Sequence, residues 1–257
     1  MAERVDFTRM LARIQAKQQE AGMLPDTNTA KSYKCDLCRD EEYVEVEKDG
    51  VVYMRPCECR GRNQIINRLK RSGLGETLVR CTFRTYTTRE VWQAEAKDDA
   101  YAFVKDHKDK WLYVGGQVGS GKTHLCTAVV LELIKQGMDA RYMLWRDEAV
   151  YLKSLITKDT EYQDAMRPYK TVDVLYIDDF LKTRKGLMPM AGDINLAIEL
   201  INYRYINRNR LTTIISSELS MDELINIDEA LGSRIMQASR NSTIIIQPER
   251  GRNYRLA

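Results

Sequence analysis

The chain has 257 residues, enough for one large domain or for one domain of about 170 residues with a smaller module. Its 40 basic and 37 acidic residues leave a net charge of only +3, so overall charge neither requires nor excludes a nucleic-acid partner. No apolar run reaches the length of a membrane span, and the charged, amphipathic N-terminus is unlike a secretory signal, so we expect a cytoplasmic protein.

The first segment carries apolar residues at helical spacing. Phe7, Met10, Leu11 and Ile14 alternate with charged and amide side chains, which predicts an amphipathic helix over residues 1–22. A polar stretch follows, so this helix has little local core to join. Packing within the chain and docking on a partner are both open to it.

The next segment, residues 23–75, contains two closely spaced cysteine pairs, Cys35-x2-Cys38 and Cys57-x-Cys59, which bracket a short hairpin-like insert. This spacing is typical of zinc ribbons and knuckles, so we expect Cys35, Cys38, Cys57 and Cys59 to bind one structural Zn²⁺. Two disulfides or an iron–sulfur site are the alternatives, and disulfides are disfavoured in an intracellular protein.

Basic residues are concentrated just after the last of these cysteines, in a stretch that predicts a helix ending at Ser72-Gly73. They are Arg60, Arg62, Arg68, Lys70 and Arg71. A solvated helix face and a surface for DNA or a partner protein are both compatible with this charge.

From about residue 80, strand and helix patterns alternate, which predicts an α/β domain with a mostly parallel sheet over residues 80–257. Helices are expected from Val91 to His107 and from His124 to Lys135. The strands that we expect, in chain order, cover residues 111–114, 140–145, 172–179, 211–218 and 242–247.

The strand at residues 111–114 leads into Gly116-x4-Gly121-Lys122-Thr123, which is the phosphate-binding P-loop pattern. Glycines let the loop aim its N–H groups at phosphate oxygens, Lys122 reaches the terminal phosphates, and the Thr123 hydroxyl binds Mg²⁺. The nucleotide-binding residues that we expect are Gly116, Gly119, Ser120, Gly121, Lys122, Thr123 and His124.

The strand at residues 172–179 delivers two carboxylates to its C-terminal end, as a Walker B strand does. Asp178 is predicted to hold Mg²⁺ through water, and Asp179 to orient or deprotonate the attacking water. A second acid beside the magnesium ligand suits activation of water, so the pair favours hydrolysis over phosphoryl transfer. Because a whole strand and helix separate the two motifs, we expect the P-loop strand and this strand not to be sheet neighbours.

Two further candidate positions follow. The strand at residues 211–218 ends in polar side chains, so Ser217 and Glu218 are expected to reach a γ-phosphate or its attacking water. Arg234 lies downstream in a helix-like segment, where an isolated arginine is ordinarily a surface residue.

Five segments together resemble the DnaC/DnaI/IstB group of AAA+ proteins, and most closely the bacterial or phage replicative helicase loaders. They are GGQVGSGKTHL, VLYIDDF, INYRYINRNRLTTIISSELSMDEL, LGSRI and ERGRNYRL. The resemblance implies an AAA+ P-loop fold with a five-stranded, mostly parallel sheet, preceded by a small helix and a zinc module. Because few residues follow the last expected strand, we expect a minimal or absent C-terminal lid. It also implies ATP and Mg²⁺, a sensor 1 role at Ser217 and Glu218, and Arg234 acting in trans on a neighbouring subunit.

One position departs from the pattern of the group. Relatives commonly read Thr-Ser-Asn where this chain has Ser216-Ser217-Glu218, so a carboxylate stands where an amide usually reads the γ-phosphate.

The function implied by the resemblance is an ATPase, weak alone and stimulated by DNA or a partner, that loads or remodels a hexameric helicase. The implied partners are a DnaB-type replicative helicase bound through residues 1–75, single-stranded DNA, and further copies of the AAA+ domain, in the cytoplasm of a bacterium or of a phage host. An IstB-type transposase helper is an alternative, which the cysteine module and the modest net charge disfavour. A zinc- or DNA-binding nucleotide clamp with weak hydrolysis is another, kept open by Glu218.

Overall fold

The computed structural model describes residues 33, 35–48, 51–183, 187–249 and 251–254. The helix expected over residues 1–22 lies outside them and stays a prediction. The chain divides into two compact units, one ending at Arg60 and one beginning at Gly61. This division falls inside the segment 23–75 that the sequence assigned to the cysteine module, and most of helix α2 (Glu58–Ser72) belongs to the second unit.

The first unit is built on an antiparallel hairpin in which β1 (Tyr43–Lys48) pairs with β2 (Val51–Pro56). The side chains of β2 are exposed along its whole length. The buried residues described in this unit are cysteines, namely Cys38, Cys57 and Cys59. Since a lone two-stranded sheet is only marginally stable in water, the hairpin depends on what holds the cysteines together.

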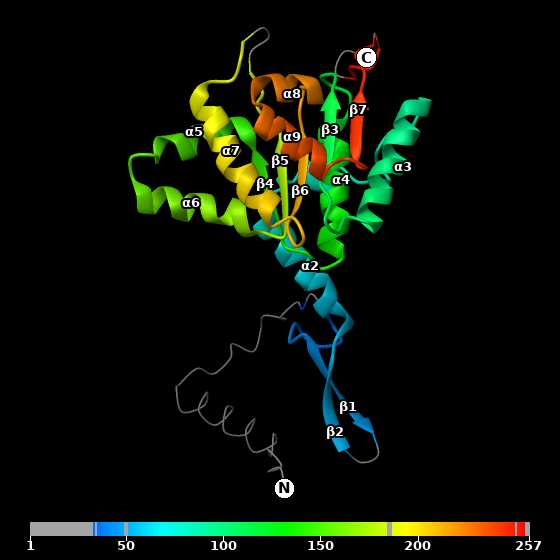
Figure 1. Ribbon diagram of the computed structural model, residues 1–257. Coiled ribbons are helices and arrows are strands. Elements are labelled where there is room, and N and C mark those ends of the chain that lie inside the picture. The colour runs from blue at the N-terminus through cyan, green and yellow to red at the C-terminus, as the bar shows by residue number, and fades with distance from the viewer. Residues whose placement is uncertain (1–32, 34, 49–50, 184–186, 250, 255–257) are drawn as a thin grey trace. The chain divides into compact units, whose positions relative to one another are not determined.

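The second unit contains a five-stranded parallel sheet of order β4-β5-β6-β3-β7 (Figure 1). Its strands are β3 (Leu112–Gly116), β4 (Ala140–Leu144), β5 (Val174–Asp178), β6 (Thr212–Ser216) and β7 (Thr243–Ile246). The predicted α/β fold class is therefore confirmed. Strand β6 lies between β3 and β5, so the P-loop strand and the acid-bearing strand are separated, as the sequence predicted.

Helices cover both faces of this sheet (Figure 1). Besides the short 3₁₀ helix η1 (Leu78–Arg80), they are α3 (Val91–Lys105), α4 (Lys122–Lys135), α5 (Trp145–Ser154), α6 (Asp159–Thr171), α7 (Ala191–Ile206), α8 (Met221–Ile227) and α9 (Glu229–Ala238). Side chains alternate along each strand, so Leu112 and Val114 pack with α3 and α4, whereas Tyr113 packs with α5, α7 and α9. The described residues that follow β7 include no helix.

Within the part of the chain that the structure describes, no helix is both long enough and apolar enough to cross a membrane.

Arg204 of α7 is a fully buried charge on the face covered by α5 to α9. Its guanidinium donates to the carbonyl oxygens of Thr212 at 2.6 Å, Val172 at 2.9 Å and Tyr169 at 3.0 Å. Burial lowers the pKa of Arg204 to about 9. Because these acceptors lie at the end of α6 and at the start of β6, the side chain fixes the region from which β5 starts.

Candidate nucleotide-binding site and cysteine cluster

The P-loop connects the end of β3 to the start of α4, as its sequence pattern predicts. Gly116 has φ +110° and Gly121 has φ +92°, backbone conformations that L side chains rarely adopt. A Cβ added at Gly116 would lie 2.1 Å from the carbonyl oxygen of Ile246 in β7. The glycine pattern is therefore required both by the turn and by the neighbouring strand.

Lys122 is almost completely buried at the mouth of this loop. Its Nζ donates to the carbonyl oxygens of Gly116 at 2.8 Å and Gln117 at 2.7 Å. Desolvation lowers the pKa of Lys122, and the opposing charges of Glu218 and Asp179 act in the other direction. The ammonium group is thus held by the loop itself and faces the carboxylates of the site.

Asp178 ends β5 as a buried carboxylate surrounded by hydroxyl groups. Its oxygens accept hydrogen bonds from Thr123 Oγ1 at 3.1 Å, Tyr176 OH at 2.8 Å and Tyr142 OH at 3.0 Å, and Ser216 Oγ also donates to it. The structure therefore brings together Thr123 and Asp178, the two residues predicted to hold Mg²⁺. Oxygen ligands of this kind suit that ion.

Asp179 follows in a turn of unusual backbone, with φ +54°. Its Oδ2 accepts a hydrogen bond from Lys182 Nζ at 3.0 Å, and the same Nζ lies 2.6 Å from Glu218 Oε1. Lys182 is a residue of the site that the sequence motifs did not indicate. The signal that could have found it is a lysine three residues after an acid pair, on the loop that follows the acid-bearing strand.

These groups enclose a cavity of about 210 Å³. The residues that line it are Val118, Gly119, Gly121, Lys122, Thr123, His124, Asp179, Lys182 and Glu218. A cavity with P-loop amides, two lysines and two carboxylates is chemically suited to a phosphate chain with its metal ion and an attacking water.

The remaining predicted residues lie outside the cavity lining. Ser120 is buried and donates to the carbonyl oxygen of Gln117 at 2.7 Å, which stabilises the loop. Ser217 is buried, and its hydroxyl donates to the carbonyl oxygen of Phe180 at 2.8 Å rather than toward the cavity. Arg234 is half-buried on α9, where it donates to the Ala230 carbonyl oxygen at 2.7 Å.

His124 links the start of α4 to the segment before α3. Its Nε2 lies 3.0 Å from the carbonyl oxygen of Thr82 and 3.2 Å from Thr85 Oγ1. The ring meets that of Tyr86 edge to face, with centroids 5.4 Å apart. His124 therefore joins two segments at one wall of the cavity.

The basic stretch of α2 is partly neutralised within the second unit. Arg68 and Arg71 form ion pairs with Asp139, at 3.3 Å and 3.0 Å. Ile65 and Leu69 on the same helix pack against the apolar cluster of α3 and α4. These contacts favour a structural role for this face of α2 over a free surface for DNA.

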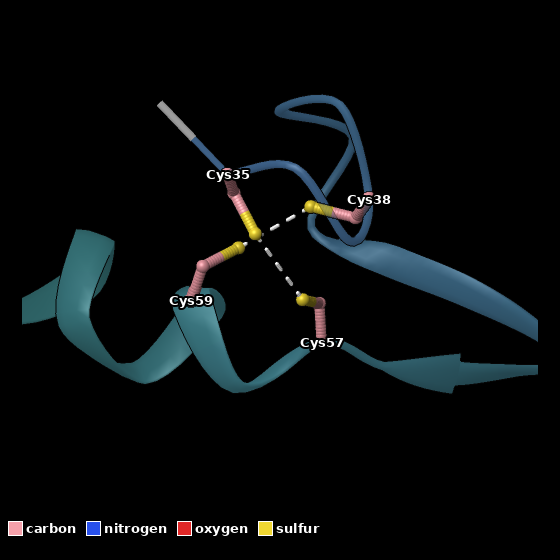
Figure 2. Close-up of side chains that lie close together, drawn as sticks. All are labelled: Cys35, Cys38, Cys57 and Cys59. Atoms are coloured by element: carbon pink, nitrogen blue, oxygen red, sulfur yellow. Dashed lines mark hydrogen bonds between the residues drawn. The ribbon is translucent and has the colours of Figure 1, made fainter. Parts of the chain in front are cut away.

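The four cysteines of the first unit converge, as Figure 2 shows. Their sulfur atoms all lie within 4.8 Å of one another, with Cys35 and Cys57 at 3.7 Å and Cys38 and Cys59 at 3.3 Å. A disulfide has an S–S bond length of about 2.05 Å, so these four cysteines are free thiols. Tetrahedral Zn²⁺ with bonds of about 2.3 Å places its sulfur ligands about 3.8 Å apart, so the four residues fit a zinc ion.

Local backbone geometry supports this arrangement. Cys35 N donates to Asp40 Oδ1 at 3.0 Å, and Arg39 and Asp40 both have positive φ in the tight turn after Cys38. A hydrogen bond from the backbone of Cys38 lowers the pKa of the Cys35 thiol to about 7, whereas the side-chain hydrogen bond with Cys38 and burial raise the pKa of the Cys59 thiol.

Comparison with known proteins places the second unit in one family. The family described as IstB-like ATP binding protein matches residues 80–245. Two curated proteins of Bacillus subtilis strain 168 are similar over most of the chain. The uncharacterized protein YqaM is 36% identical over 79% of this chain and 67% of its own length, and XkdC of the phage-like element PBSX is 30% identical over 87% and 86%.

Solved structures share the fold. The crystal structure of the DnaC helicase loader superposes with a TM-score of 0.57 at 24% identity, over 67% of this chain and 99% of that one. The crystal structure of DnaI superposes with a TM-score of 0.52 at 18% identity, over 70% of this chain and 94% of that one. The structure of the replication initiator DnaA bound to AMPPCP and single-stranded DNA superposes with a TM-score of 0.53 at 21% identity, over 69% of this chain and 52% of that one. At these identities the similarity establishes the AAA+ fold.

Proposed function

Because this chain belongs to the IstB-like ATP-binding protein family, we propose that it is an ATPase that loads or remodels a hexameric replicative helicase on single-stranded DNA. Family membership agrees with the resemblance read from the sequence motifs. The observation that carries the enzymatic part is the cavity lined by the P-loop Lys122, Thr123 and Asp179, together with the hydrogen bond from Thr123 to the buried Asp178.

Each group in the cavity has a role in this proposal. Lys122 and the P-loop amides bind the phosphate chain, and Thr123 and Asp178 are the residues that would hold Mg²⁺, which neutralises charge on the phosphates when bound. Asp179 orients the attacking water and accepts its proton. Arg234, which lies outside the cavity of its own chain, completes the site of a neighbouring subunit.

The helicase as partner is supported by the proteins that this chain resembles. A helicase loader, DnaC, and DnaI share its fold, and XkdC, from a phage-like element, is similar over most of its length. We assign partner binding to residues 1–75. The hairpin offers apolar side chains for it, since Val51, Val52, Tyr53 and Met54 are all exposed.

The proposal is tested by mixing the full chain with ATP, Mg²⁺, a DnaB-type helicase from the same genome or host, and a single-stranded oligonucleotide. Complex mass is measured by light scattering, and phosphate release is measured in parallel. We expect an ATP-dependent complex and DNA- or helicase-stimulated turnover. Lys122→Ala should abolish nucleotide binding, whereas Asp179→Asn should keep binding and lower turnover by about 10²-fold or more. No complex in any combination would refute helicase loading.

The IstB relationship supports one second candidate, a transposase helper that acts on duplex DNA. It predicts ATP-dependent binding to long duplex DNA in place of binding to a helicase. The same mixture with duplex DNA substituted for the oligonucleotide separates the two functions. Persistent nucleotide binding with unchanged function in Asp179→Asn would instead identify a clamp without an essential hydrolysis step.

A further inference from the structure

Lys182 bridges two carboxylates inside the nucleotide cavity. Its Nζ lies 3.0 Å from Asp179 Oδ2 and 2.6 Å from Glu218 Oε1, and all three side chains line the cavity beside Lys122. The three side chains are about one-third exposed, with fractions of 31%, 32% and 29% for Lys182, Asp179 and Glu218. The bridge is therefore accessible to a ligand that enters the cavity.

The turn that carries Lys182 is fixed on both sides. Asp179 and Leu181 have φ values of +54° and +53°, which cost of order 1 kcal/mol or more for residues other than glycine. Phe180 and Leu181 are buried, and the Phe180 ring packs edge to face on Trp145 with centroids 4.9 Å apart. Phe180 N donates to the Ser216 carbonyl oxygen at 2.9 Å, and Lys182 N to the Asp179 carbonyl oxygen at 3.1 Å. The strained turn thus aims Lys182 into the cavity.

The charges around the cavity indicate an electrostatic role for Lys182. Asp179 and Glu218 line the cavity, and the buried Asp178 lies behind Thr123, whereas Lys122 is the P-loop cation. Without a second cation, Lys122 would be the single lysine opposite the two carboxylates of the cavity lining, and a triphosphate is still negatively charged after it has bound one magnesium ion. Carboxylates so close to a phosphate would repel it. A second ammonium group at this point offsets that repulsion.

Resting on the ATPase function proposed above, we infer that Lys182 binds the γ-phosphate directly from within the same subunit, and that Glu218 acts as its positioning residue. Glu218 then does not read the phosphate itself. Glu218, the carboxylate that replaces the usual amide, holds Lys182 in place, and Lys182 binds the γ-phosphate. The Lys182–Glu218 ion pair thus takes the role that a neutral amide has in relatives. The site consequently distinguishes ATP from ADP through Lys182.

The test measures the affinities of the full chain for ATP and for ADP in Mg²⁺, by competition with a fluorescent nucleotide. We expect Lys182→Met to weaken ATP binding about tenfold or more and ADP binding less than twofold, because a charged hydrogen bond to the γ-phosphate is lost. Lys182→Arg should restore most of the preference for ATP. Glu218→Gln should lower that preference about threefold, and it should add nothing in the Lys182→Met background.

Lys135→Met is the matched control, because Lys135 is an exposed lysine of α4 that pairs with Glu132 outside the cavity. Thermal unfolding establishes that each variant is folded. Equal losses for ATP and ADP, or no loss of ATP affinity in Lys182→Met, would overturn the role of Lys182. An effect of Glu218→Gln that persists in full without Lys182 would overturn the positioning role. If the unaltered chain binds neither nucleotide, the proposed ATPase function fails, and this inference fails with it.

Discussion

The two units of this chain are stabilised in different ways. The second unit buries apolar side chains on both faces of a parallel sheet and adds a buried arginine that binds backbone carbonyls. The first unit has a hairpin whose strand β2 is exposed, and the buried side chains among its described residues are three of the four clustered cysteines. One unit is thus stabilised by a buried apolar core, whereas the described residues of the other bury few side chains besides thiols, whose arrangement fits a metal ion.

We propose that the four clustered cysteines bind a structural metal ion, and loss of that ion should have the largest effect, confined to the first unit. In Cys38→Ser, we expect the hairpin to unfold, because structural zinc contributes about 10 kcal/mol or more to the folding of small modules. Metal content by mass spectrometry and limited proteolysis between residues 35 and 60 measure the loss. Cys81→Ser is the control, since Cys81 lies outside the cluster. Full protease resistance of Cys38→Ser would contradict a metal-dependent unit.

Replacing the buried arginine tests the second unit. We expect Arg204→Met to lower the free energy of unfolding by about 3 kcal/mol, because several buried carbonyl oxygens lose their donor. For a chain of this size that corresponds to a fall of about 6–12 °C in the melting temperature of the second unit. Arg210→Met, at an exposed position in the turn after α7, should change it little. An unchanged melting temperature for Arg204→Met would show that those carbonyls find other donors.

The same contrast explains how much the sequence could predict. The P-loop and the acid pair are local patterns, because consecutive residues determine their backbone conformation. Gly116 and Asp178 therefore lie at the strand ends that the sequence predicts. The separation of β3 from β5 followed from chain order. The cysteine cluster followed from spacing alone, because metal ligands impose the same geometry on many folds.

What the sequence could not predict depends on side-chain direction and on contacts between distant segments. The bridge from Lys182 to Glu218 needs the positive φ values of the turn and the adjacency of β5 and β6. Ser217 stands at the expected strand end, yet its hydroxyl turns to the Phe180 carbonyl oxygen. Helix α6 was not predicted either, and Pro168 inside it is ordinarily a signal that ends a helix.

A smaller effect is expected where two helices of the second unit meet closely. A Cβ at Gly232 of α9 would lie 2.6 Å from the backbone nitrogen of Ile225 in α8. We expect Gly232→Ala to destabilise the unit by about 1–3 kcal/mol, because backbone atoms must move apart. In the matched control, Gly61→Ala, the added methyl meets nothing within 4 Å, and helix propensity favours alanine by about 1 kcal/mol. Opposite signs for the two variants in denaturant unfolding would verify the distinction, and equal signs would refute it.

The smallest effect on stability should come from the exposed hairpin strand. Val52 and Met54 are 62% and 49% exposed, so replacing both with serine should change the unfolding free energy by less than about 0.5 kcal/mol per site. Metal content and nucleotide affinity should not change, because neither residue belongs to the cysteine cluster or to the residues that line the cavity. If the hairpin binds the helicase, the same double variant should weaken complex formation about tenfold or more, since buried apolar anchors dominate protein interfaces. Unchanged complex mass across a helicase titration would move the partner surface away from β2, and a loss of bound metal would show instead that β2 supports the cysteine cluster.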